Sequence, residues 1–167
     1  MNKKHKPRLQ IIRGLPGSGK TTLALSRYSN LMRIETDMYF SREGEYRFTL
    51  PLNRKACVWF LKAVENFCIQ GFDFVTTGVF AAHTERLSSV IETALQYGYE
   101  VYIKTLTDSH GSIHGVPKEH LDAMKASFVL EQELKRTYRD EKKVHFGLMP
   151  KKYPLAHLNR HNKGKQN

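Results

Sequence analysis

The sequence predicts an α/β protein in which a small, mainly parallel sheet lies between layers of helices, a three-layer α/β/α arrangement. Short apolar runs alternate along the chain with segments whose apolar residues recur at helical spacing. A glycine-rich turn joins the first apolar run to the first helical segment, and glycines follow the next two helical segments. Such alternation is typical of parallel sheets covered by helices on both faces. At 167 residues the chain is long enough for one domain with a substantial core.

The first half of the chain contains two expected strands and two expected helices. In order, these are a strand at Leu9–Arg13, a helix at Lys20–Tyr28, a strand at Leu31–Ile34 and a helix at Asn53–Gln70. The intervening residues 38–52 look irregular. Gly71 is a plausible stop for the longer helix, whose inward residues are expected to be Ala56, Phe60, Ala63, Val64 and Phe67.

The second half continues the alternation. The expected elements are a strand at Phe72–Thr76, a helix at His83–Tyr97 ended by Gly98, a strand at Tyr99–Leu106 and a long helix that begins at Pro117. The inward residues of the two helices are expected to be Leu87, Val90, Ile91, Ala94 and Leu95, and then Leu121, Met124 and Phe128.

The turn between the first strand and the first helix carries a complete G-x-x-x-x-G-K-[ST] phosphate-binding pattern. Its residues, with the one that follows, are Gly14, Leu15, Pro16, Gly17, Ser18, Gly19, Lys20, Thr21 and Thr22. Backbone N–H groups of such a turn and the N-terminus of the helix favour a bound anion. Lys20 is expected to reach the β- and γ-phosphates of ATP, and the Thr21 hydroxyl to bind Mg²⁺.

A carboxylate follows the second expected strand. Asp37 is placed at the carboxyl end of that strand, on the same side of the sheet as the phosphate-binding turn. There it can accept a proton from a substrate hydroxyl, and it is also a candidate for the metal. Glu35 is a second candidate, and the alternative for Asp37 is a turn or helix cap.

A further carboxylate for the metal is harder to place. The only acid of the third expected strand, Asp73, lies at its amino end, on the opposite edge of the sheet. Thr76 and Thr77 lie at the correct edge, where their hydroxyls can bind a metal-bound water but bring no charge. Either Asp37 also serves the metal, or the metal is held weakly.

Candidates for binding an anionic substrate are Arg42 and Arg47, in the irregular segment after Asp37, with solvated surface arginines as the alternative. The loop before the last helix is the expected position of a lid. It contains no Lys or Arg, and its His110 and His114 are better explained as surface histidines.

The net charge of +11 is concentrated at the two ends of the chain. Residues 1–8 contain four Lys/Arg and residues 142–167 contain seven, with no acid in either segment; the remainder carries 16 basic and 16 acidic residues. The expected organisation is therefore a basic tail at 1–8, a domain at 9–141 and a basic tail at 142–167. Such tails can contact nucleic-acid phosphates, and solubilising ends are the alternative.

Cysteine usage and hydropathy favour a cytoplasmic protein. Cys57 and Cys68 lie three turns apart on one expected helix, too far for a disulfide, and are expected to be core thiols. The N-terminal residues lack the apolar stretch of a signal peptide, and no apolar run is long enough to span a membrane.

Several short strings, taken in order, carry a family resemblance. They are the phosphate-binding loop, Thr36-Asp37-Met38-Tyr39-Phe40, Gly44-Glu45-Tyr46-Arg47-Phe48, Tyr97-Gly98-Tyr99-Glu100-Val101 and Ile113-His114-Gly115-Val116-Pro117. Over roughly residues 9–135 the chain resembles the polynucleotide 5′-kinase-like P-loop ATPases, which include phage polynucleotide kinase domains and AAA-33-type proteins. The resemblance implies a P-loop kinase-like fold, ATP with Mg²⁺, and Asp37 as the general base for transfer to a hydroxyl.

Two departures accompany this resemblance. Thr76-Thr77-Gly78-Val79 replaces an Asp-x-Thr-Asn-like string, and Gly111-Ser112 replaces an Arg-Asn-type pair. The phosphate-binding loop, Asp37 and the resemblance together predict a phosphotransferase that acts on a nucleic acid or nucleotide. The two departures favour the alternative, a catalytically weak ATP-binding accessory protein that binds nucleic acid or a protein partner through its basic tails.

Overall fold

A computed structural model describes residues 5–42, 45–46, 49–80, 84–108 and 117–150. Its main sheet has five parallel strands in the order β2-β5-β1-β6-β7. The strands are β1 (Arg8–Gly14), β2 (Met32–Glu35), β5 (Phe74–Gly78), β6 (Glu100–Leu106) and β7 (Val144–Phe146). A separate antiparallel pair consists of β3 (Ser41–Arg42) and β4 (Glu45–Tyr46). The predicted α/β class with a parallel sheet is confirmed.

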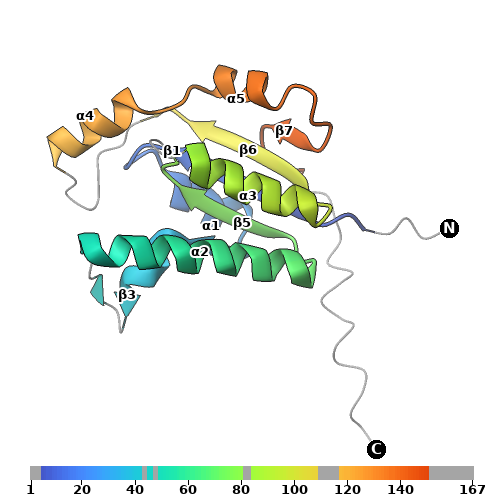
Figure 1. The fold of residues 1–167 in the computed structure, drawn as a ribbon, viewed down its shortest axis with the longest axis horizontal. Helices are drawn as coiled ribbons and strands as arrows, with labels where there is room; N and C mark the ends of the chain where they lie inside the picture. Colours follow the sequence, from blue (N-terminus) through green and yellow to red (C-terminus); the bar gives the residue numbers. More distant parts are fainter. Residues whose placement is uncertain (1–4, 43–44, 47–48, 81–83, 109–116, 151–167) are drawn as a thin grey trace, which may run out of the picture.

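Helices cover both faces of the main sheet, as Figure 1 shows. They are α1 (Lys20–Arg27), the 3₁₀ helix η1 (Thr36–Phe40), α2 (Leu50–Gln70), α3 (Thr84–Gln96), α4 (Lys118–Ala126) and α5 (Glu131–Thr137). One core lies between the sheet and α2, α3 and α5, and a smaller one lies under α1. No helix within the described residues is long and apolar enough to cross a membrane.

Strand β1 is the centre of the sheet, and all seven of its residues are buried. Leu9 and Ile11 belong to the larger core and Ile12 to the smaller one, because successive side chains of a strand point to opposite faces. The strand is therefore buried on both faces, and its polar residues Arg8, Gln10 and Arg13 are buried together with its apolar ones. Its carboxyl end leads directly into the glycine-rich turn.

The inward faces of the two long helices follow their apolar spacing. Ala56, Phe60 and Val64 of α2 are buried, as are Leu87, Val90, Ile91 and Ala94 of α3. Gly71 ends α2 at φ 70°, a left-handed backbone conformation that favours glycine. Of the two predicted core thiols, Cys68 is buried and Cys57 is half-buried; both are free.

The region after residue 116 differs from the single long helix that the spacing predicts. It contains α4 and α5, separated by residues 127–130, and none of the residues of α4 is buried. Phe128, expected to face inward from a helix, lies in that connection. Its ring is packed against the Arg13 guanidinium, 4.2 Å from ring centroid to Cζ.

The fold also extends past the expected domain boundary at residue 141. Strand β7 adds an edge to the sheet beside β6, and Met149 is buried under α1. The side-chain oxygen of Gln10 accepts hydrogen bonds from the Met149 N–H at 2.6 Å and from the Tyr28 hydroxyl at 2.8 Å. Residues 142–150 therefore belong to the folded domain, while residues 1–4 and 151–167 of the expected tails lie outside the described residues.

Asp73 lies at the amino edge of the sheet, as its position in the sequence predicts. It accepts hydrogen bonds from the Arg8 side chain at 2.6 and 3.0 Å and from the Arg8 backbone N–H at 2.8 Å. His5 Nε2 lies 3.0 Å from the same carboxylate. This carboxylate therefore fastens the beginnings of β1 and β5 together, at the edge opposite the phosphate-binding turn.

Candidate active site

The turn from β1 into α1 has the backbone that the phosphate-binding pattern requires. Gly17 and Gly19 adopt φ values of 79° and 83°, which side chains disfavour. A Cβ on Gly14 would lie 2.8 Å from the backbone oxygen of Leu106 and would also collide with the Ser18 hydroxyl. The glycines thus allow a tight loop that packs against β6 and leads into the N-terminus of α1, where the helix dipole favours an anion.

Lys20 folds back over this loop. Its Nζ donates a hydrogen bond to the Leu15 carbonyl oxygen at 2.8 Å and lies 3.5 Å from the Ser18 hydroxyl. Burial lowers the pKa of Lys20, and the carboxylates of Asp37 and Glu35 oppose that shift. Both carboxylates therefore lie within electrostatic reach of the loop lysine.

Thr21 and Thr22 occupy the first turn of α1, and both are exposed. A hydroxyl at this position is free to meet a ligand held by the loop. No group of three or more His, Cys, Asp or Glu side chains within the described ranges could hold a metal by itself. The available donors are single oxygens, which suit Mg²⁺ bound together with nucleotide phosphates rather than in an all-protein cage.

Asp37 lies in η1, immediately after the carboxyl end of β2, and its side chain is exposed. Packing on α2 holds this short helix in place. The Tyr39 and Trp59 rings lie 5.8 Å apart, and Phe40 is buried. The structure thus places Asp37 at the predicted edge of the sheet, on a segment fixed by aromatic contacts.

Glu35 ends β2 and is paired in register with Thr77 of the neighbouring strand β5. The Thr77 hydroxyl donates to Glu35 Oε1 at 2.5 Å, and Arg33 Nη1 donates to the same oxygen at 2.7 Å. Thr76 behaves differently from the prediction: its buried hydroxyl donates to the Ile34 carbonyl oxygen at 2.8 Å inside the sheet. Only Thr77 of the two threonines is directed to a group at the site.

The substrate-binding candidates are not brought into the site by any described contact. Arg42 forms part of β3, where it pairs with Glu45, and its side chain is not among those described. Arg47, His110 and His114 lie outside the described residues. Substrate binding by Arg42 and Arg47 therefore stays a prediction from the sequence, as does the interpretation of His110 and His114 as surface histidines.

Arg13 is a buried cation that the sequence reasoning passed over as part of an apolar strand. It precedes Gly14, is fully buried, and donates from Nη2 to the Val129 carbonyl oxygen at 2.8 Å. Its Nε and Nη1 have no hydrogen-bond partner among the residues that the structure describes. Burial lowers the pKa of Arg13 to about 10, although Glu131 acts in the opposite direction. The available signal was a charged residue directly before the phosphate-binding loop, in the central expected strand.

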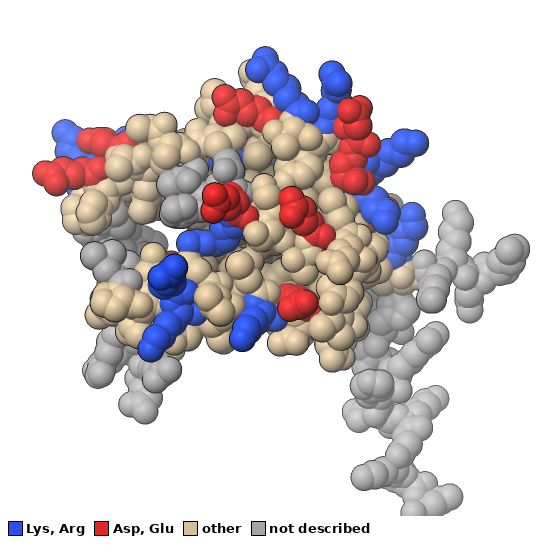
Figure 2. Space-filling view, in the orientation of Figure 1, with Lys and Arg blue, Asp and Glu red and all other residues tan. Residues whose placement is uncertain are grey.

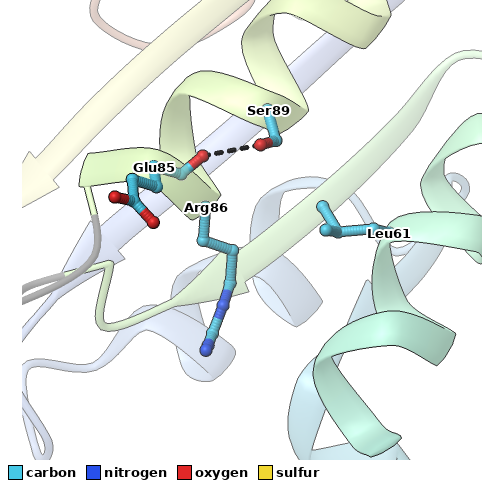
Figure 3. Close-up of a pocket in the computed structure, with 4 residues that line it drawn as sticks. All are labelled: Leu61, Glu85, Arg86 and Ser89. Carbon is cyan, nitrogen blue, oxygen red and sulfur yellow. Dashed lines mark hydrogen bonds between the residues drawn. The ribbon is translucent and has the colours of Figure 1, made fainter. Parts of the chain in front are cut away.

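A second missed cation is Arg86, at the beginning of α3. It lines a cavity of about 250 Å³ between α2 and α3, together with Leu61, Glu85 and Ser89. In Figure 3 the Arg86 side chain extends into the space between the two helices, whereas the Glu85 carboxylate points away from it. This cavity lies on the helical flank, and no measured contact joins it to the phosphate-binding loop.

Charges of both signs are distributed over the face that α2 and α3 form. Figure 2 shows Lys and Arg side chains interspersed with Asp and Glu side chains there, and a hollowed surface between α2 and the part of the molecule that carries α4. A large field of one sign would be expected for a dedicated polyanion-binding face. The face in Figure 2 does not have that character.

Comparisons of sequence find distant relatives, one of which is described here. No family model matches the chain. The chain is 25% identical over 123 residues to the uncharacterized protein PM0531 of Pasteurella multocida (strain Pm70), covering 65% of this chain and 69% of that protein.

Solved structures are similar at the level of the fold. Kti12 of Chaetomium thermophilum, solved in complex with ADP-AlF3, matches with a TM-score of 0.55 at 13% identity, over 83% of this chain and 88% of that one. A chain of the Pnkp1/Rnl/Hen1 complex matches with a TM-score of 0.50 at 20% identity, over 74% of this chain and 40% of that one. A putative kinase from Chloroflexus aurantiacus j-10-fl matches with a TM-score of 0.46 at 20% identity, over 60% of this chain and 59% of its own. The chain thus spans less than two thirds of two of these three structures. The fold that it shares with Kti12 and with the chain of the Pnkp1/Rnl/Hen1 complex is an α/β fold, here with a parallel sheet.

Proposed function

We propose that the chain binds ATP with Mg²⁺ at residues 14–22 and transfers the γ-phosphate to a hydroxyl of a nucleic acid or nucleotide. One observation carries the proposal. The ammonium of Lys20, folded over a glycine-rich loop, lies within electrostatic reach of the exposed carboxylate of Asp37. A phosphate-binding cation and a proton acceptor thus share one edge of the sheet. Kti12, which has a similar fold, was solved in complex with ADP-AlF3, and this supports a nucleotide as the ligand of the chain.

In the proposed reaction the loop N–H groups and Lys20 hold the phosphates. The acceptor hydroxyl oxygen attacks the γ-phosphorus, and its proton passes to the carboxylate of Asp37. The bond between the γ-phosphorus and the bridging oxygen breaks, which leaves ADP. Thr21 would hold a Mg²⁺ that neutralises charge on the phosphate oxygens.

The experiment is an acceptor panel with γ-labelled ATP, comprising oligonucleotides with a free 5′-hydroxyl, nucleosides and sugars. Asp37→Asn is expected to lower transfer by about 10²–10⁴-fold, the usual contribution of a general base. Lys20→Ala is expected to lower both nucleotide binding and transfer. Lys62→Ala and Asp140→Asn are matched controls, because both residues are exposed and outside the site. No transfer to any acceptor by a protein that binds ATP would contradict the proposal.

A second candidate function is that of an ATP-binding accessory protein with weak catalysis. The favouring observation is at the end of β5, which presents Thr76 and Thr77 in place of an acid, with the Thr76 hydroxyl used inside the sheet. In that case ATP would bind with ordinary affinity and turn over slowly with every acceptor. Rapid transfer to any acceptor would rule it out.

Nucleic-acid binding through the basic tails is a separate part of the proposal. A variant that ends at Pro150 tests it, because β7 and Met149 belong to the folded domain and must be retained. If residues 151–167 contact phosphates, this deletion flattens the salt dependence of polynucleotide binding. An unchanged slope would leave these residues without that role.

A further inference from the structure

The carboxyl end of β5 has no acid, although Mg²⁺ at a phosphate-binding loop is usually assisted by one or two carboxylates. The strand ends in Thr76-Thr77-Gly78, and the acid that precedes the strand in the sequence, Asp73, is bound to Arg8 at the opposite edge of the sheet. Any carboxylate that assists the metal must therefore come from another element.

Glu35 reaches this position from the neighbouring strand. It is the register partner of Thr77 and is held by the hydroxyl of that residue at 2.5 Å and by Arg33 at 2.7 Å. Both bonds go to Oε1; the other oxygen, Oε2, accepts no hydrogen bond from a described residue. The carboxylate is thus fixed through one oxygen, and the second is available to a cation or its bound water.

The strand order sets the distance between Glu35 and the loop. Strand β5 lies between β2 and β1, and Thr77 is in register with Ile12, two residues before the loop begins. Two strand spacings, about 10 Å, therefore separate the backbone of Glu35 from that of β1. A glutamate side chain and one water molecule can bridge most of that distance. Glu35 and Asp37 both raise the pKa of Lys20 against the effect of burial, so both carboxylates lie within electrostatic reach of the same cation.

We propose that Glu35 is the metal-side carboxylate of this site, positioned by Thr77 and acting through water on the Mg²⁺ of the bound nucleotide. This assignment rests on the proposed function, and it separates the metal role of Glu35 from the role of Asp37 as the base. Arg33 and Thr77 then have the role that outer partners have at other metal sites: they orient a carboxylate without touching the ion.

The test is the Mg²⁺ dependence of ADP affinity, measured by isothermal titration calorimetry in Mg²⁺ and in EDTA. Mg²⁺ is expected to tighten ADP binding to the unmodified protein. Glu35→Gln is expected to reduce that gain by about 10–100-fold, as removal of outer-shell partners does elsewhere, while affinity in EDTA is kept or improved. Glu65→Gln, an exposed position on α2, is the matched control.

Two threonine variants test the positioning. Thr77→Val removes the hydroxyl and should lose part of the Mg²⁺ gain, whereas Thr77→Ser retains the hydroxyl and should keep it. Electron paramagnetic resonance of Mn²⁺ with ADP gives a second readout, because free Mn²⁺ should increase in Glu35→Gln. Melting temperatures show that each variant is folded.

The inference is overturned if Glu35→Gln keeps the full Mg²⁺ gain, or if Asp37→Asn removes it while Glu35→Gln does not. If Glu35→Gln lowers the melting temperature but Mg²⁺ still increases ADP affinity by the full amount, the carboxylate only stabilises the sheet. The proposed function has its own control in this assay, since Lys20→Ala should weaken ADP binding even in EDTA. If Lys20→Ala loses ADP binding and Glu35→Gln has no effect, the proposal that the loop binds a nucleotide is kept. Only the assignment of Glu35 is then removed.

Discussion

Arg13 donates from Nη2 to the carbonyl oxygen of Val129 at 2.8 Å and so joins the strand before the phosphate-binding loop to the connection between α4 and α5. The Phe128 ring covers the same guanidinium. Helix α4 has no buried residue of its own, and Figure 1 shows it beyond the carboxyl ends of the strands, clear of the sheet. Arg13 therefore helps to hold helix α4 in place, through its contacts with the connection that follows that helix.

Replacing Arg13 with methionine is expected to stabilise the protein. Nε and Nη1 are buried without partners, and burying a cation in this way is costly, whereas methionine fills a similar volume without charge. We expect Arg13→Met to raise the free energy of unfolding by about 1–3 kcal/mol in chemical denaturation at pH 7. Arg13→Ala is the comparison, because it leaves a cavity and should destabilise. A destabilised Arg13→Met would mean that the guanidinium is well solvated by water.

The difference in the free energy of unfolding between Arg13→Met and the unmodified protein is expected to depend on pH. Burial lowers the pKa of Arg13 in the folded protein to about 10, while in the unfolded chain this pKa has its higher, ordinary value. The cost of the buried charge is therefore fully present below pH 10 and declines as the folded protein loses the proton above it. The stability advantage of Arg13→Met should be constant up to about pH 10 and shrink above it, measured against unmodified protein at each pH.

Asp73→Asn is expected to lower the free energy of unfolding by about 2 kcal/mol, because it leaves the nearly buried Arg8 guanidinium without its carboxylate. Nucleotide affinity should not change, since the pair lies at the opposite edge of the sheet. Denaturation and ADP titration on the same sample check both statements. Equal losses in stability and affinity would contradict the separation of the two edges.

Glu100 should contribute stability that disappears in acid. Its Oε2 lies 2.6 Å from His145 Nε2, and this hydrogen bond is the main cause that holds the pKa of Glu100 below its usual value near 4.5. A depressed carboxyl pKa stabilises the folded state above the unfolded pKa, and the effect is lost as pH falls through the folded one. Glu100→Gln should therefore be less stable than the unmodified protein at pH 6 and equally stable near pH 3. A constant difference across that range would argue against the pairing.

The two thiols should react at different rates in the folded protein. Burial raises the pKa of Cys68 to about 12, so this thiol stays protonated at pH 8.5, whereas Cys57 is half-buried. Iodoacetamide should modify Cys57 first and Cys68 only as fast as the protein unfolds. Mass spectrometry of Cys57→Ala and Cys68→Ala variants separates the two, and rapid labelling of Cys68 would refute its burial.

The sequence predicted those parts of the site that depend on neighbouring residues in the chain. The phosphate-binding loop and the position of Asp37 follow from a local pattern and from one strand end. The contact between Glu35 and Thr77 depends on β2 pairing with β5, a choice of strand order that no local pattern encodes. Nor could the pattern identify Phe128 as the cover of Arg13, because that contact spans 115 positions and requires a break between α4 and α5.

The amino edge of the sheet brings the two ends of the folded domain together. Arg8 Nη1 lies 3.5 Å from the carbonyl oxygen of Pro150, so the chain enters and leaves the domain at one point, behind the phosphate-binding loop. The point at which the five Lys and Arg of residues 151–167 join the domain is therefore on the far side of the sheet from Lys20. Ending the chain at Pro150 would remove these five positive charges and leave the edge of the sheet that carries Lys20 and Asp37 untouched.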